Sequence, residues 1–245
     1  MKTVFSLVVV LGVAFFMYEN SKNKSLSDLN NISDLVDTLS TQYGSGNKTQ
    51  TQTESDNQPT EPSEPVEHSK EAINYFNTIC RGSEYGSGDQ ISKWNSDVKV
   101  YVMGQKRDYL MDEFKSIVNE LNSYIDPINI KFVNSRSEAN FVVVFGSAQD
   151  YVNVEPYAAN YVEDNWGLFT TNSGSVIYDA NMFVDIFRCT DIDGQKHLLR
   201  EEFTQALGFK QDSYDYPNSM FYQGWTTTTE YAPIDVEIIK MLYNE

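Results

Sequence analysis

The sequence predicts an α+β domain that begins near residue 70 and runs to residue 245. Three observations lead to this fold class. Runs of β-branched and aromatic residues lie between residues 98 and 178, one long amphipathic helix interrupts them, and two further helical patterns follow. A chain of this length forms one ordinary domain and is able to bury a substantial core.

The predicted elements follow a simple order along the chain. They are a helix at Lys70–Cys80, a strand at Val98–Met103, a helix at Asp108–Tyr124, and strands at Ile128–Val133, Asn140–Phe145, Gly167–Thr171 and Ser175–Tyr178. The helix at 108–124 is predicted from apolar residues at helical spacing, among them Leu110, Phe114 and Leu121. The last two strands flank Asn172-Ser173-Gly174, which predicts a hairpin-like turn.

The next helix, expected over Leu198–Leu207, carries the most informative motif. From Arg200 to Asp212 the sequence reads R-E-E-F-T-Q-A-L-G-F-K-Q-D, which resembles the elongated zinc-peptidase signature H-E-x-x-H-x-x-G-x-x-H. The general-base glutamate (Glu202), the glycine (Gly208) and a trailing acid (Asp212) are present. All three histidines are replaced, and Glu201, Gln205 and Gln211 stand in their places.

The replaced residues decide whether the motif is able to hold zinc. Residues four apart share one face of a helix, and a glycine after the helix lets the chain return a third ligand. Glutamate and glutamine offer only oxygen, and an uncharged amide is a poor zinc ligand. We therefore expect no cofactor. If a metal binds, its ligands would be Glu201, Gln205 and Gln211, or His197, which lies four residues before Glu201.

Without its context, the same segment also fits an ordinary amphipathic core helix that ends at a glycine. In that interpretation Leu199, Phe203, Ala206 and Leu207 face inward. At 100° per residue, Glu201, Glu202 and Gln205 form a polar flank, whereas His197, Arg200 and Thr204 lie on the more exposed side.

Two later landmarks strengthen the zinc-peptidase interpretation. Asn218-Ser219-Met220-Phe221-Tyr222 resembles the Met-turn of the metzincin peptidases, and residues 232–243 resemble the closing helix of the matrixin branch. The chain is also similar to an uncharacterised bacterial envelope family of zincin-like domains that carries E-E-x-x-Q. The resemblance implies a twisted mixed sheet, a long helix, an active-site-type helix, a Met-turn and a C-terminal helix. Gly167–Thr171 or Ser175–Tyr178 would form the upper edge of the cleft.

The resemblance also implies a polar cluster at the former metal site. Its members are Glu201, Glu202, Gln205, Gln211, Asp212 and Tyr222. If no metal binds, these side chains should hydrogen-bond to one another, because unpaired charge in a partly buried pocket is costly. They would then join the helix, the turn after it and the Met-turn around Met220 in place of the metal.

The region before residue 70 predicts export. Residues 1–24 read as a signal peptide or signal anchor, because Lys2 precedes an apolar run from Val4 to Tyr18. Residues 25–40 form a possible short amphipathic helix, and residues 41–69 form a polar, disordered linker. The domain is therefore expected in the cell envelope, either membrane-anchored or free in the periplasm or outside the cell. Contact with a membrane is expected only through the N-terminal segment.

The charge and the cysteines narrow the expectations further. A formal net charge of −17 argues against nucleic-acid binding, which needs basic surfaces. The two cysteines, Cys80 and Cys189, suggest one disulfide in an exported domain, and the alternative is two buried thiols. Three functions stay open: a non-catalytic module that binds a peptide or protein, a working hydrolase with Glu202 as general base, and a structural envelope domain.

Overall fold

The computed structural model describes residues 8–9, 68–81 and 89–244. The predicted signal segment, short amphipathic helix and linker therefore lie outside the described residues, apart from residues 8–9 and 68–69. In these described ranges, no helix is long and apolar enough to cross a membrane.

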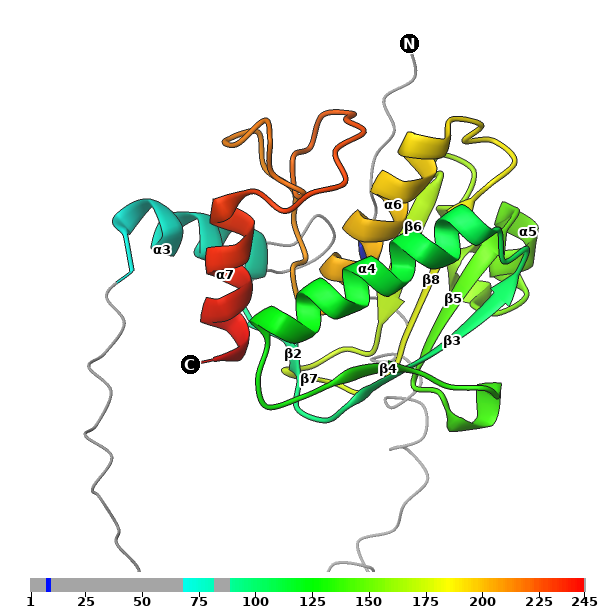
Figure 1. Ribbon diagram of the computed structural model, residues 1–245, viewed down its shortest axis with the longest axis horizontal. Coiled ribbons are helices and arrows are strands. Elements are labelled where there is room, and N and C mark those ends of the chain that lie inside the picture. Colours follow the sequence, from blue (N-terminus) through cyan, green and yellow to red (C-terminus); the bar gives the residue numbers. More distant parts are fainter. Residues whose placement is uncertain (1–7, 10–67, 82–88, 245) are drawn as a thin grey trace, which may run out of the picture. The chain divides into compact units, whose positions relative to one another are not determined.

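A mixed sheet forms the centre of the fold (Figure 1). Its strand order is β1-β6-β8-β5-β3-β4. Strand β5 runs parallel to β3 and β8, β3 runs parallel to β4, and β6 runs antiparallel to β8. Two short strands, β2 and β7, pair in parallel outside this sheet. The bounds are Val8–Val9 (β1), Lys93–Trp94 (β2), Val98–Gly104 (β3), Ile130–Phe132 (β4), Phe141–Gly146 (β5), Gly167–Thr171 (β6), Val176–Ile177 (β7) and Ala180–Asp185 (β8).

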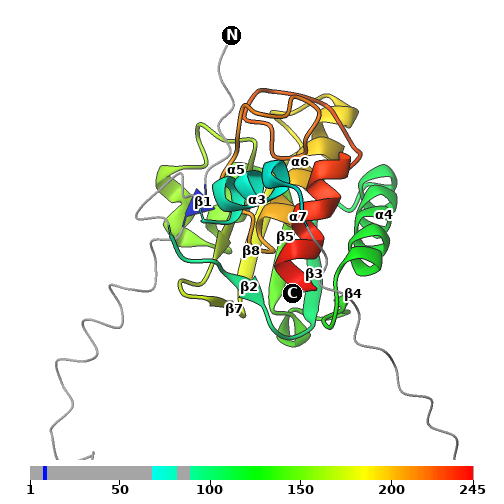
Figure 2. The same cartoon turned by 90° about the vertical axis from the view of Figure 1, so that its left-hand side faces the viewer.

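The helices cover both faces of the sheet (Figures 1 and 2). On one face α4 and α6 pack with α7, and on the other lies α5. The bounds are Lys70–Phe76 (α3), Asp108–Tyr124 (α4), Ala148–Val152 (α5), Ile192–Gln205 (α6) and Pro233–Tyr243 (α7). Asn77–Arg81 continues α3 as a π-helical turn, and Arg136–Glu138 and Pro156–Asn160 are 3₁₀-helices. All six residues of β5 are buried, because helices cover it from both sides.

The core has a larger and a smaller part, one on each face of the sheet. In the larger part, Val143 and Phe145 of β5 share one hydrophobic cluster with Phe114 of α4 and Phe203 of α6. Phe203 stacks on Phe141 with ring centroids 4.9 Å apart. The smaller part places Tyr151 of α5 against the opposite face, where its ring stacks on Phe183. Helix α6 is thus fixed to the sheet by large aromatic side chains.

The predicted hairpin around residues 172–174 is wrong. Strand β6 pairs with β8, a strand that the sequence did not predict, and β7 pairs with β2 instead. The side chain of Asn172 organises the connection, because its Oδ1 accepts hydrogen bonds from the backbone nitrogens of Tyr178 (2.8 Å) and Asp179 (3.2 Å). A side chain that satisfies backbone groups locally thus organises the longer loop between the antiparallel strands β6 and β8.

The predicted disulfide is also wrong, because Cys80 and Cys189 are both free and buried. Cys189 lies just before α6, where its thiol faces the Asp191 carbonyl at 3.7 Å. Cys80 lies beyond the other end of α6, since the nitrogen of Lys210 donates to the carbonyl of neighbouring Ile79 at 2.9 Å. Helix α6 has 14 residues, so about 20 Å of helix lies between the two places. Disulfides need Cα atoms within about 7 Å.

The predicted fold class is confirmed. The domain is α+β, with a mixed sheet, a long helix (α4), a helix in the position of the active-site helix (α6), a buried methionine after it (Met220) and a C-terminal helix (α7). Helix α6 begins six residues before the predicted Leu198, because the side chain of Asp191 caps it by accepting a hydrogen bond from the Gly194 nitrogen.

Candidate functional site

Helix α6 is buried around almost its whole circumference. The sequence predicted that His197, Arg200 and Thr204 lie on a more exposed side, and this is wrong, because all three are buried. These side chains are buried because two segments far away in the sequence pack over them. Helix α4 covers Arg200, and the segment before α7 covers His197 and Thr204. The Thr204 hydroxyl lies 2.7 Å from the hydroxyl of Tyr231.

Arg200 shows how a buried cation is satisfied on this helix. Its guanidinium donates to Glu120 at 2.6 Å and to Glu113 at 2.7 Å, both from α4. Its other side lies over the ring of Tyr231, 4.8 Å from the ring centroid. A buried charge is tolerated when it is paired and hydrogen-bonded. Arg200 therefore ties α6 to α4. The candidate site lies instead on the flank of α6 that carries His197, Glu201 and Glu202.

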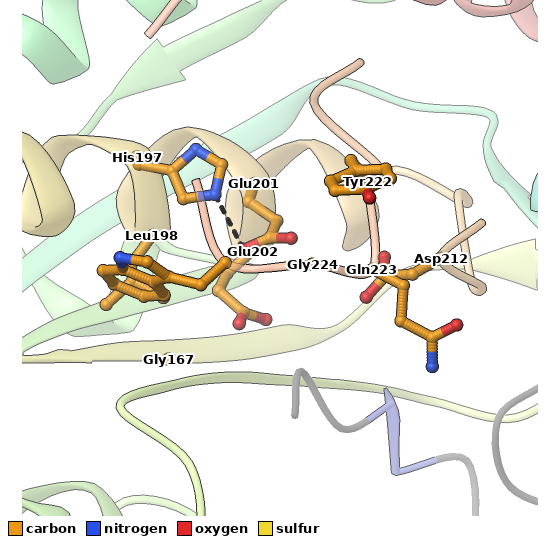
Figure 3. Close-up of a pocket in the computed structure, with 10 residues that line it drawn as sticks. Gly167, His197, Leu198, Glu201, Glu202, Asp212, Tyr222, Gln223 and Gly224 are labelled. Carbon is orange, nitrogen blue, oxygen red and sulfur yellow. Dashed lines mark ion pairs between the residues drawn. The ribbon is translucent and has the colours of Figure 1, made fainter. Parts of the chain in front are cut away.

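His197 begins that flank (Figure 3). Its Nδ1 lies 2.8 Å from the Thr228 carbonyl, which only accepts, so Nδ1 carries the proton. Its Nε2 faces Glu201 Oε2 at 3.6 Å, and the two side chains point toward each other. Burial lowers the pKa of His197, against the hydrogen bond to Thr228 that raises it. With the proton on Nδ1, Nε2 is the acceptor nitrogen of the neutral ring, and the Thr226 hydroxyl lies 3.4 Å from it.

A small pocket lies beside this flank. Helix α6 contributes His197, Leu198, Glu201 and Glu202, β6 contributes Gly167, and the later loops contribute Asp212, Tyr222, Gln223, Gly224 and Trp225. The cavity measures about 20 Å³, enough for about one water molecule or one group of that size. The motif residues thus line a small polar notch with an aromatic rim rather than a deep substrate pocket.

Gly167 brings β6 close to Glu202. A Cβ at Gly167 would lie 2.7 Å from Glu202 Oε1, so only glycine lets the strand backbone approach this carboxylate. The sequence offered Gly167–Thr171 and Ser175–Tyr178 as alternative edges of the cleft. The structure places the first of these, β6, at the pocket.

The structure brings most, but not all, of the predicted polar cluster together. Glu201, Glu202, Asp212 and Tyr222 line one pocket. Gln205 reaches the same group, because its Nε2 donates to Asp212 Oδ1 at 2.5 Å. Gln211 is not among the lining residues; its backbone nitrogen donates to the Ile79 carbonyl at 3.2 Å.

The structure describes both predicted structural residues, Gly208 and Met220. Gly208 has a φ of +129° and follows α6 by three residues, and its nitrogen donates to the Gln205 carbonyl. Met220 is fully buried, and its nitrogen donates to Asp235 Oδ2 at 2.8 Å. Ser219 also donates to Asp235, at 2.6 Å, so the turn at Met220 is tied to the start of α7.

The residues present do not fit a zinc ion of the peptidase kind. The second ligand position holds an amide whose nitrogen donates to Asp212, and the third position, Gln211, does not line the pocket. Within residues 68–81 and 89–244, no group of three or more histidine, cysteine, aspartate or glutamate side chains is arranged to hold a metal ion. The remaining donors are mainly carboxylate oxygens, which suit zinc less well than imidazole does.

Motif reasoning missed two contributions to the site, Trp225 and Asp235. Trp225 comes from another part of the chain, and no local pattern singled it out. Asp235 was visible only as part of the C-terminal helix pattern. Its carboxylate accepts from Ser219, Met220 and Ala232, and so joins the turn at Met220 to the start of α7.

Comparison with known proteins gives distant structural similarity and a family. Two solved structures of myroilysin are similar to this chain. One is 15% identical and has a TM-score of 0.41, covering 62% of this chain and 82% of that one. The other is 14% identical and has a TM-score of 0.42, covering 69% and 93%. No curated protein matches the chain. The family described as protein of unknown function (DUF2927) matches residues 69–245, and this chain belongs to it.

Proposed function

We propose that this chain is an exported zincin-like domain that does not hydrolyse peptides with zinc and instead binds a peptide or protein segment beside α6. The observation that carries the proposal is the hydrogen bond from Gln205 Nε2 to Asp212 Oδ1. This bond ties the amide at the second ligand position to an acid of the same pocket, and the amide oxygen that remains is uncharged and a poor zinc ligand.

The shape and charge of the pocket support a partner that inserts only a small group. The cavity of about 20 Å³ leaves no room for a bulky side chain. Glu201, Glu202 and Asp212 line it, which favours an amine or another hydrogen-bond donor at its floor. Trp225 is 46% exposed at its rim and packs against Trp166, so it offers an apolar platform to the rest of the partner.

Export is part of the proposal and rests on the apolar segment from Val4 to Tyr18 and the polar linker after it. The domain would act in the cell envelope, either tethered or released. Fractionation of cells that make the full chain checks this. Recovery of the chain in the cytoplasm alone would contradict it.

A working metallopeptidase is the alternative, with Glu202 as general base. The observation that favours it is His197, whose Nε2 faces Glu201 at 3.6 Å in the pocket that Glu202 lines. A neutral imidazole with its Nδ1 held by a backbone carbonyl is the form in which histidine binds metals. An ion held there would need oxygen ligands for its other positions.

Metal analysis of the full chain, purified without chelator, separates the two functions. We expect well under one zinc per chain and no peptidase activity, and the same result for Glu201→Gln and for the exposed control Glu230→Gln. Stoichiometric zinc that is lost in Glu201→Gln and His197→Ala but kept in Glu230→Gln would establish the hydrolase.

Peptide selection separates a binding module from a structural one. Panning a random peptide library against the full chain should enrich peptides whose binding is lost in Trp225→Ala. Tyr178→Ala is the matched control, because Tyr178 is 56% exposed and does not line the pocket. A library that enriches no Trp225-dependent peptide would favour a purely structural role.

A further inference from the structure

A second and larger hollow lies at the other end of β6 from the α6 pocket. It shares no lining residue with that pocket, and its volume of about 430 Å³ falls in the usual range for small-molecule sites, roughly 300–1,000 Å³. The lining residues that matter here are Glu155, Tyr157, Thr170, Thr171, Tyr178 and Asn181. We call this hollow the β6–β8 groove.

The sheet changes from apolar to polar where the β6–β8 groove begins. Leu168 of β6 pairs with Phe183 of β8, and both pack in the core under α5. Two residues further along β6, on the same face, Thr170 pairs with Asn181. The hydroxyl of Tyr151 marks the boundary, because it donates to the Asn181 carbonyl at 3.1 Å. Beyond α5 the face is therefore built from groups that form hydrogen bonds.

The carboxylate of Glu155 is a hydrogen-bond acceptor in this polar face. It precedes the 3₁₀-helix Pro156–Asn160, and its Oε1 accepts from the Tyr157 nitrogen at 3.3 Å. Its Oε2 accepts from Thr170 Oγ1 and from Asn181 Nδ2, each at 3.4 Å. Three elements thus hold one carboxylate in place. These contacts are long, so the carboxylate keeps capacity for a stronger donor.

Two tyrosine rings add flat apolar surface to the groove. Tyr157 is 60% exposed and Tyr178 is 56% exposed. Both rings stand on ordered backbone: Tyr157 follows the Glu155 cap, and the Tyr178 nitrogen donates to Asn172 Oδ1 at 2.8 Å. An aromatic ring on an ordered backbone contributes contact area, and its binding costs little conformational entropy.

The aromatic rings, the carboxylate and the hydroxyls of the groove together indicate which kind of ligand it would bind. Flat aromatic faces suit a ring with an apolar C–H side, a carboxylate suits a donor, and hydroxyls suit groups that both donate and accept. Sugars present all three. We propose that the β6–β8 groove binds a carbohydrate of one or two sugar rings, stacked on Tyr157 or Tyr178, with a hydroxyl donating to Glu155.

Titration of the full chain with neutral trisaccharides tests the proposal, which does not depend on the function of the α6 pocket. The probes are cellotriose, chitotriose, maltotriose and mannotriose, followed by NMR shifts and calorimetry. We expect at least one to bind, and Tyr157→Ala or Tyr178→Ala to weaken it about tenfold or more. Tyr214→Ala, which removes a ring that is 62% exposed and outside the groove, should leave binding within about twofold.

Glu155→Gln and spermidine distinguish a sugar from a cation. Sugar binding should weaken in Glu155→Gln and change little with salt, since it involves no ligand charge. The proposal is overturned if no trisaccharide binds at about 10 mM, or if both tyrosine variants bind like the wild type. It is also overturned if only spermidine binds and Glu155→Gln abolishes that binding while Glu163→Gln does not.

Discussion

At the residue scale, Gly208 combines two constraints at the end of the motif helix. Its φ of +129° is a conformation that L residues rarely adopt, and a Cβ there would lie 2.2 Å from the carbonyl oxygen of Ser92. A side chain at this position would therefore cause both backbone strain and a steric clash with Ser92. We expect Gly208→Ala to lower the free energy of unfolding by about 2–4 kcal/mol, measured by urea denaturation.

Gly174→Ala is the matched control for that measurement. Gly174 also has a positive φ, +112°, but a Cβ there meets nothing within 4 Å. Only the conformational strain applies, so the loss should be about 1 kcal/mol. Equal losses at both positions would mean that the close approach of Ser92 contributes nothing.

At the element scale, the sequence predicted those elements whose local pattern decides their structure. Helix α4 has the predicted bounds because its apolar residues repeat at helical spacing and one side faces the sheet. Strand β8 was missed because Ala180–Asp185 shows no alternation and lacks the run of β-branched residues that identified the equally buried β5. The burial of Arg200 was missed because its partners Glu113 and Glu120 lie 80 or more residues away.

For the candidate site, too, the sequence predicted what a local pattern decides and missed what long-range packing decides. Motif spacing on one helix and its following turn was enough to name Glu201, Glu202 and Asp212, which line one pocket. The periodicity of a helix says nothing about what covers it, so Trp225 could not be placed, and Gly167 was placed only through the resemblance, as part of one of two possible cleft edges. The third motif position, Gln211, is not among the residues that line the pocket, since spacing along the sequence does not set the geometry of a turn after a helix.

Asp235 is the residue that connects elements at the C-terminal end. It accepts from Ser219 Oγ, which also lies 2.7 Å from the hydroxyl of Tyr75 in α3, and from the nitrogens of Met220 and Ala232. Asparagine offers one acceptor oxygen instead of two, which leaves a buried donor unsatisfied. We expect Asp235→Asn to lower the free energy of unfolding by about 1–3 kcal/mol, with Glu230→Gln within about 0.5 kcal/mol of wild type.

The cost of that substitution should depend on pH. Burial raises the pKa of Asp235 above its usual value, against three hydrogen bonds that lower it. A raised folded-state pKa stabilises the fold below the unfolded pKa, near 3.9, and this contribution disappears as pH rises through the folded pKa. The stability difference between wild type and Asp235→Asn should therefore be larger at pH 4 than at pH 7. A difference that grows with pH would contradict the direction of the shift.

At the scale of the whole molecule, the thiols report whether the domain opens as one unit. Cys80 and Cys189 are fully buried and lie beyond opposite ends of α6, so a reagent reaches both only when the core opens. Burial also raises the pKa of both thiols, that of Cys189 to about 11, so little reactive thiolate exists at pH 8.

We expect the native full chain to react slowly with a thiol reagent and to show two reactive thiols in denaturant, with or without prior reduction. Thr227→Cys, at an exposed position, should add one thiol that reacts at once and so confirms the reagent. If denatured protein shows no thiol until it is reduced, the two cysteines are joined and the packing at the ends of α6 is wrong. If one thiol reacts quickly in the native state, that end of α6 opens locally and the domain does not open as one unit.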